Sequence, residues 1–148
     1  MGKSAQRFTA ETQAESRKIV AQATETIRGI GQQAFHDLST DAKTLGGYGA
    51  PVASGRLAGS MRIALNQIDG SAEPADRSYR YPPGKGPRPL PPRTIPNVKA
   101  STVAAILRRF KLGDVIYISN SVPYIRRVEL HGHSWQTPGG VFGPTIRK

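Results

Sequence analysis

The sequence contains no cysteine. Disulfide bonds, thiolate metal ligands and cysteine nucleophiles are therefore excluded, and the composition suits a reducing compartment. Long apolar runs are also missing: none approaches the roughly 20 residues of a membrane span, and the opening residues MGKSAQRFTAETQ lack the apolar core of a signal peptide. We expect a protein that is made and works in solution.

Acidic residues are scarce, with 10 Asp and Glu against 21 Lys and Arg and a net charge of +11. The few carboxylates are scattered, which disfavours a metal-dependent nuclease, because such enzymes usually hold their ions with clustered acidic residues. A positive excess of this size indicates a polyanionic partner or an acidic protein surface. The alternative is that the charge simply keeps the protein soluble.

The chain has 148 residues, of which 37% are hydrophobic, and this is enough for one modest core. We therefore expect a single domain over residues 1–148. Its 16 glycines and 12 prolines predict a large share of loop. The apolar residues must then be concentrated in a few helices and strands.

Residues 8–45 have the periodicity of one long amphipathic helix, with apolar residues at spacings of three and four. Gly29 and Gly31 lie inside this helix. Because a glycine in a helix interior costs about 1 kcal/mol relative to alanine, we expect a kink or a close helix contact there. The apolar stripe consists of Ile19, Ala23, Ile27, Ile30, Ala34, Leu38, Ala42 and Leu45.

Two later segments combine helix and strand patterns. Residues 54–68 predict a short helix followed by a strand over 62–68. Residues 101–132 predict a helix capped by Ser101, then a strand, then a second helix over 124–130. The strand at 115–120 is the strongest in the chain because it is rich in β-branched and aromatic residues.

Residues 69–98 contain most of the prolines and no helical stripe. Proline lacks an amide donor and has a fixed φ, so we expect an extended arm there. Its tyrosines and arginines are typical of interfaces, although tyrosines in such a loop can equally pack on their own domain. The tail, 133–148, shows no clear helix or strand. The candidate interface residues are Tyr79, Arg80, Tyr81, Lys85, Arg88, Arg93 and Trp135.

The histidines offer a possible metal site. His131 and His133 lie on either side of a glycine, with Glu129 nearby and His36 distant in sequence. A catalytic zinc needs three protein ligands in fixed geometry, which alternating residues past a helix end do not provide. We expect an exposed or partner-facing histidine pair and a protein that is not an enzyme, with no cofactor. A metal-dependent nuclease centred on this pair is the alternative.

Two short segments resemble a known family. The first, 54–61, precedes a strand, and the second, 116–133, includes a strand and the helix after it. Their order and spacing resemble the neck and tail-completion proteins of tailed bacteriophages, which include head-tail joining and minor tail proteins. The sequence departs from the family pattern with Ser54 for Thr, Ile125 for Ala and the Pro-rich insertion. The motif residues are Gly55, Arg56, Leu57, Ser60, Asn120, Pro123, Tyr124, Glu129 and Gly132.

The resemblance implies an α+β fold in which a long N-terminal helix packs on a small, mostly antiparallel sheet, here with the Pro-rich arm added. It implies a structural protein of the virion, made in the host cytoplasm, whose copies form a ring in the neck or tail. The implied partners are its own copies, the neighbouring connector and tail proteins, and passing DNA held without sequence readout, with no membrane. From charge alone, the alternative is a basic nucleic-acid-binding protein of the ribosomal or chromatin kind.

Physical reasoning gives the motif residues structural roles. Arg56 can pair with a carboxylate such as Glu129. Asn120 and Pro123 can stop the strand and start the last helix, and Tyr124 can anchor that helix on the sheet.

Overall fold

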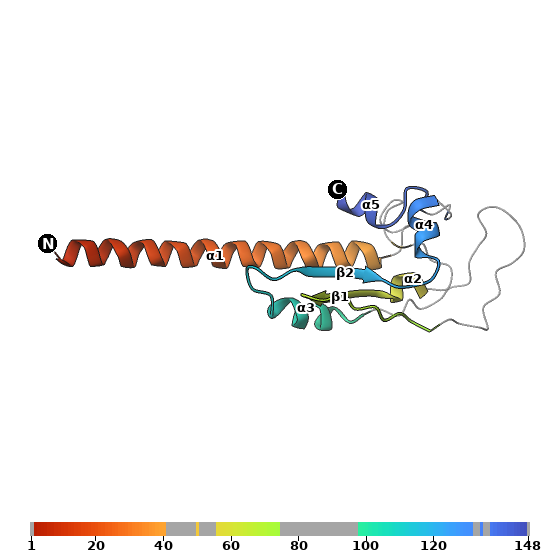
Figure 1. Cartoon of the computed structure of the whole chain (residues 1–148), viewed down its shortest axis with the longest axis horizontal. Helices are drawn as coiled ribbons and strands as arrows, with labels where there is room; N and C mark the ends of the chain where they lie inside the picture. The colour runs from red at the N-terminus through yellow and green to blue at the C-terminus, as the bar shows by residue number, and fades with distance from the viewer. Residues whose placement is uncertain are drawn as a thin grey trace, which may run out of the picture.

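The computed structural model describes residues 2–40, 50, 56–74, 98–131, 134 and 137–147. They form an α+β fold, as expected, with a long N-terminal helix beside a small antiparallel sheet (Figure 1). In chain order the elements are α1 (Gly2–Ser39), α2 (Arg56–Gly59), β1 (Met61–Leu65), α3 (Ala100–Arg108), β2 (Ile116–Asn120), α4 (Ile125–His131) and α5 (Phe142–Ile146).

The sheet of the described residues has two antiparallel strands. β1 pairs with β2 so that Ile63 lies opposite Ile118, and the strongest predicted strand is confirmed as β2. Met61 and Ile63 are buried in the core. The strand expected over 62–68 is shorter than predicted, because Asn66 has a φ of +61°, which breaks the extended conformation.

Helix α1 begins earlier and ends earlier than the predicted 8–45. It runs from Gly2 to Ser39, and its 38 residues give it a length of about 57 Å. Beyond it, the carbonyl oxygen of Thr40 accepts a hydrogen bond from the amide of Ala50 at 2.8 Å. This contact ties the end of the helix to the body of the protein.

The C-terminal part of α1 packs on the body, whereas its N-terminal part extends past the sheet (Figure 1). Phe35 is 4% exposed. A Cβ added at Gly31 would lie 3.1 Å from Cδ1 of Ile116, so the close contact expected at the glycines is confirmed there. The predicted core stripe is wrong for Ile19 and Ile30, which are exposed. Ile19 precedes the part of α1 that packs on the body, and Ile30 faces solvent within that part.

The core lies where α1, the sheet, α3 and α4 meet. Its apolar side chains come from segments far apart in the chain, which is typical of a single-domain core. The buried cluster consists of Phe35, Leu38, Ala50, Leu57, Ala58, Met61, Ile63, Val103, Leu107, Val122, Val128 and Val141.

Helix α3 is held by contacts that the sequence does not predict. The cap expected from Ser101 is wrong: Lys99 takes the N-cap position, and no N-cap side chain bonds to the first turn. At the other end, Nη2 of Arg28 in α1 donates hydrogen bonds to the carbonyl oxygens of Arg108 at 2.8 Å and Phe110 at 2.9 Å. Arg28 therefore satisfies acceptors at the C-terminus of α3 and links the two helices.

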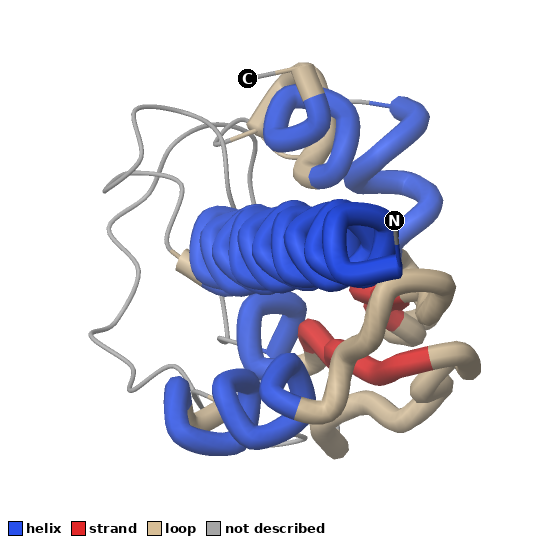
Figure 2. Tube along the Cα trace, turned by 90° about the vertical axis from the view of Figure 1, so that its left-hand side faces the viewer, coloured by secondary structure: helices blue, strands red, loops and turns tan. Residues whose placement is uncertain are grey.

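The C-terminal segment contains a helix that the sequence does not predict. Residues 133–148 show no helical pattern, yet α5 forms at Phe142–Ile146. It lies on the side of α1 opposite to α3, as both views of the chain show (Figure 1, Figure 2). The helix expected over 124–130 is confirmed, with small shifts, as α4.

Candidate functional site

The first motif segment binds the start of the predicted arm. Ser60 is fully buried, and its Oγ accepts a hydrogen bond from the amide of Glu73 at 2.9 Å. Arg56 donates from Nε to the carbonyl oxygen of Glu73 at 2.8 Å, and Leu57 packs in the core. None of the ion pairs among the described residues joins Arg56 to Glu129, so Glu129 is not the carboxylate partner of Arg56.

The second motif segment closes onto the first through Asn120. Its Nδ2 donates a hydrogen bond to the carbonyl oxygen of Leu57 at 2.7 Å, and its Oδ1 accepts one from the amide of Val122 at 3.1 Å. In the sheet, Asn120 lies opposite Met61. Asn120 is the last residue of β2 and ends the strand, as expected.

The first residues of the predicted arm are tied to the sheet. Arg62 forms an ion pair with Glu73 at 3.1 Å and donates from Nε to Oγ of Ser71 at 2.8 Å. Ser119 donates from Oγ to the carbonyl oxygen of Asp69 at 2.7 Å. Hydrogen bonds from the backbone and side chain of Ser71 lower the pKa of Asp69. The beginning of the arm is therefore part of the folded body.

Glu129 binds the start of α5. Its carboxylate accepts hydrogen bonds from the amides of Val141 at 2.7 Å, Phe142 at 3.0 Å and Gly143 at 2.9 Å. Gly140, immediately before them, has a φ of +89°. Because the N-cap residue supplies no side-chain bond of its own, a carboxylate from α4 satisfies the free amides of α5.

Two further motif residues lie at the start of α4. Pro123 is exposed in the turn before the helix, in the position expected for it. Tyr124 is half-buried and packs against the core, in agreement with its predicted role as an anchor. The remaining predicted positions lie outside the described residues: Gly55, Gly132, Tyr79, Arg80, Tyr81, Lys85, Arg88, Arg93 and Trp135.

A polar network closes the other end of the sheet. Asn66 donates from Nδ2 to Oδ1 of Asp114 at 2.8 Å, and its Oδ1 accepts from the amide of Val115 at 2.9 Å. Oδ2 of Asp114 accepts a hydrogen bond from the amide of Lys111 at 2.8 Å. The bond from the Asn66 side chain, together with the one from Lys111, lowers the pKa of Asp114.

Helix α1 presents apolar side chains to solvent both on its extended part and beside the body. Phe8 is 72% exposed, Ile19 59% and Ile30 63%. These residues lie 11 positions apart, which is just over three helical turns, so they share one face. Side chains of this size on one exposed face indicate an interaction surface.

Positive charge is concentrated in the second half of the described chain. The four ion pairs of the described residues all lie within residues 1–74. From residue 98 onward the carboxylates are Asp114 and Glu129, and both accept hydrogen bonds from amide groups. None of the cations of this half forms an ion pair with a described carboxylate. They are Lys99, Arg108, Arg109, Lys111, Arg126, Arg127 and Arg147.

The histidines are not assembled into a metal site among the described residues. In that part of the chain no group of three or more His, Cys, Asp or Glu side chains is placed to hold a metal ion. His131 ends α4, whereas His133 lies outside the described residues. None of the described helices is both long enough and apolar enough to cross a membrane.

Two structural residues have weak sequence signals. Arg28 is one of many basic residues, and what distinguishes it is its place on the side of α1 that packs against α3. Asn66 follows an alternating strand pattern directly, and asparagine is a residue that tolerates positive φ. That signal marks a strand end but does not identify Asp114 as the partner.

No protein-family model, no curated protein and no solved structure matches this chain.

Proposed function

We propose that this protein is a structural virion protein of a tailed bacteriophage, and that its copies form part of the neck or tail-completion ring that joins head to tail. The observation that carries the proposal is the meeting of the two motif segments. Met61 of the first segment lies opposite Asn120 of the second, and Asn120 bonds to the carbonyl oxygen of Leu57. The described residues of the two motif segments thus meet at the pairing of β1 with β2.

The extended part of α1 supports assembly with other copies. Most helices in proteins are stabilised by tertiary packing of an apolar face and not by helix propensity alone. Phe8 and Ile19 have no packing partner among the described residues, being exposed in the single chain. A neighbouring copy in a ring would cover this face and stabilise the helix.

The excess of cations favours a second candidate, a basic nucleic-acid-binding protein that acts outside any virion. Salt distinguishes the two. Phosphate binding weakens steeply as salt is added, whereas a ring held by apolar contacts does not dissociate in the same way. A protein recovered from particles as a salt-resistant assembly supports the virion role.

A stop codon early in the gene for this chain, placed in the genome that encodes it, tests the proposal. We expect DNA-filled heads and complete tails to accumulate unjoined, as seen by negative-stain microscopy of lysates. Infectivity should return when the wild-type chain is supplied from a plasmid. Joined, infectious particles that lack the chain would contradict the proposal.

A further inference from the structure

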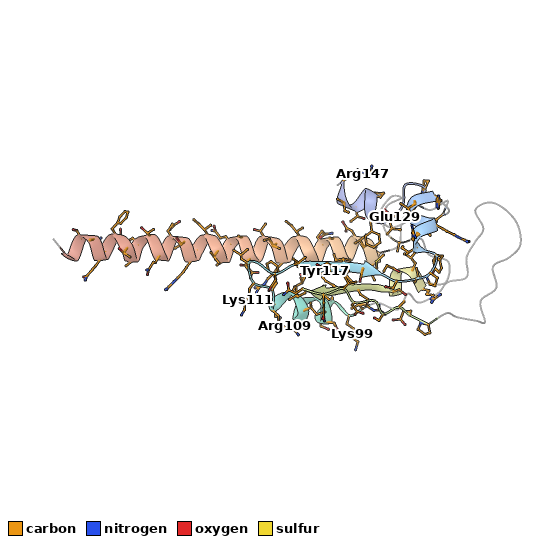
Figure 3. All side chains as sticks on the ribbon, viewed as in Figure 1. Lys99, Arg109, Lys111, Tyr117, Glu129 and Arg147 are labelled. Carbon is orange, nitrogen blue, oxygen red and sulfur yellow. The ribbon has the colours of Figure 1, made fainter. Side chains whose placement is uncertain are left out.

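Basic side chains gather at the two ends of α3. Lys99 and Arg109 take the N-cap and C-cap positions, and Lys111 follows on the connection toward β2 (Figure 3). These three and Arg108 are exposed. None of the four takes part in an ion pair of the described chain. Together they are named the α3 cation face.

Asp114 offsets this positive charge only in part. It accepts hydrogen bonds from the Asn66 side chain and from the amide of Lys111, and its charge interacts with that of Lys111. Glu129 accepts hydrogen bonds from the amides at the start of α5. Four cations near a single carboxylate leave a net positive charge, and a polyanion bound to them would relieve the repulsion among them.

Among the described residues, no aromatic side chain is exposed on this surface. Ser101, Thr102 and Ala105 are exposed and small, Leu112 is 43% exposed, and Phe110 is 2% exposed. Protein interfaces depend on large anchors, above all aromatic residues and arginines that are fully desolvated. Contacts to a nucleic-acid backbone need cations and small hydroxyl donors instead. The composition of the face therefore favours phosphates over an acidic protein surface.

We propose that the α3 cation face binds the phosphate backbone of double-stranded DNA without reading its sequence. Arg108, Arg109 and Lys111 lie close together in sequence and are exposed at the C-terminal end of α3, and a DNA duplex carries one charge per about 1.7 Å of its axis. Several phosphates therefore fall within reach of the face. The inference rests on the proposed function for its setting, since a protein at the head-tail junction meets the genome as it passes.

A pair of variants with the same net charge tests the location of the site. Arg108→Gln/Arg109→Gln removes two charges from the α3 cation face, and Arg126→Gln/Arg127→Gln removes two from another exposed pair on α4. Binding to a short fluorescent duplex of arbitrary sequence is measured by anisotropy over a range of salt. The backbone contact from Arg28 to residue 108 uses a carbonyl oxygen, so it is retained in the first variant.

We expect the α3 variant to bind about tenfold more weakly and to lower the slope of log affinity against log salt by about 2, whereas the α4 variant stays close to wild type. Equal losses in the two variants would overturn the proposal, because they would reflect net charge alone. Absence of duplex binding by the wild-type chain at low salt would overturn it too. So would equally tight, α3-dependent binding of poly-glutamate, which would point to an acidic protein partner.

These outcomes are independent of the stop-codon experiment. A chain that joins heads to tails but does not bind DNA through α3 would sustain the virion role and overturn the DNA site. A chain that binds DNA through α3 but is dispensable for joining would sustain the DNA site and overturn the virion role.

Discussion

The carboxylate of Glu129 lies directly against the backbone of Gly140. A Cβ built on Gly140 would come within 2.9 Å of both the carbonyl oxygen and the carboxylate of Glu129. The φ of Gly140 is +89°, a conformation that side chains of L-residues rarely adopt. This close approach places the amides of Val141 and Gly143 on the carboxylate. Helix α5 therefore depends on a contact between α4 and the tail.

Replacing this glycine should destabilise the fold. Gly140→Ala combines a strained φ with displacement of Glu129, and we expect a loss of about 2 kcal/mol or more in the free energy of unfolding. Gly139→Ala is the control, because its Cβ would meet Cγ of Pro144 at an ordinary 3.6 Å. Urea titration measures both variants. Equal effects of the two substitutions would show that the contact with Glu129 has no special role.

The two glycines inside α1 should respond differently to alanine. A Cβ at Gly29 meets nothing within 4 Å, whereas one at Gly31 lies 3.1 Å from Cδ1 of Ile116. Gly29→Ala should therefore stabilise the protein by up to about 1 kcal/mol through helix propensity alone. Gly31→Ala should gain less, or lose stability, because the packed side chains must move. Thermal unfolding compares them, and a larger gain at Gly31 would contradict this packing.

Acid should weaken the network at Asp114. The hydrogen bond from the Asn66 side chain, followed by that from the Lys111 amide, holds the pKa of Asp114 below its ordinary 3.8. Because the pKa is lower in the folded state, the charged carboxylate stabilises the fold above that ordinary value. The contribution is lost as the pH falls through the lowered pKa of the folded state.

The matching experiment compares wild type with Asp114→Asn by urea unfolding at neutral pH and at about pH 2. We expect the variant to be less stable at neutral pH and the difference to shrink in acid. Glu15→Gln, on the exposed part of α1, serves as the control and should show little difference at either pH. A difference for Asp114→Asn that is unchanged by acid would exclude the carboxylate charge as its source.

Self-association should depend on the apolar face of α1. Phe8→Glu/Ile19→Glu places charge on that face, and Gln6→Glu/Gln13→Glu places the same charge roughly on the opposite face. All four side chains are exposed, so both variants should unfold within about 0.5 kcal/mol of wild type. Sedimentation velocity should show oligomers for wild type and the control, and monomers for the apolar-face variant. Oligomers of wild type and of both variants would show that the apolar face of α1 does not form the contact between copies.

Much of the fold follows from local sequence pattern. The β-branched run of β2 predicts its strand directly, and the apolar spacing of α3, with Val103 and Leu107 buried, predicts its helix. Gly31 predicts a close contact, and the structure places Ile116 against it. In each case the deciding information lies within a few residues of the element.

The elements that were missed depend on distant residues. Helix α5 has a Gly- and Pro-rich surrounding and no cap of its own, and it forms because Glu129 supplies the capping acceptor. Periodicity predicts that Ile19 and Ile30 are in the core, but both are exposed. An apolar stripe shows that a helix has a packing face and does not show what covers that face. The pairing of Arg56 likewise could not be chosen from residue types, since several carboxylates were available to it.

The most direct test of the proposed role is to locate the protein in phage particles. Gold-labelled antibody against this chain, imaged by electron microscopy on particles from the source, would show where it resides. We expect label at one discrete position, the junction between capsid and tail. Particles that carry no label, together with protein that purifies with nucleic acid and is released by salt, would contradict the virion role and favour a free nucleic-acid-binding protein.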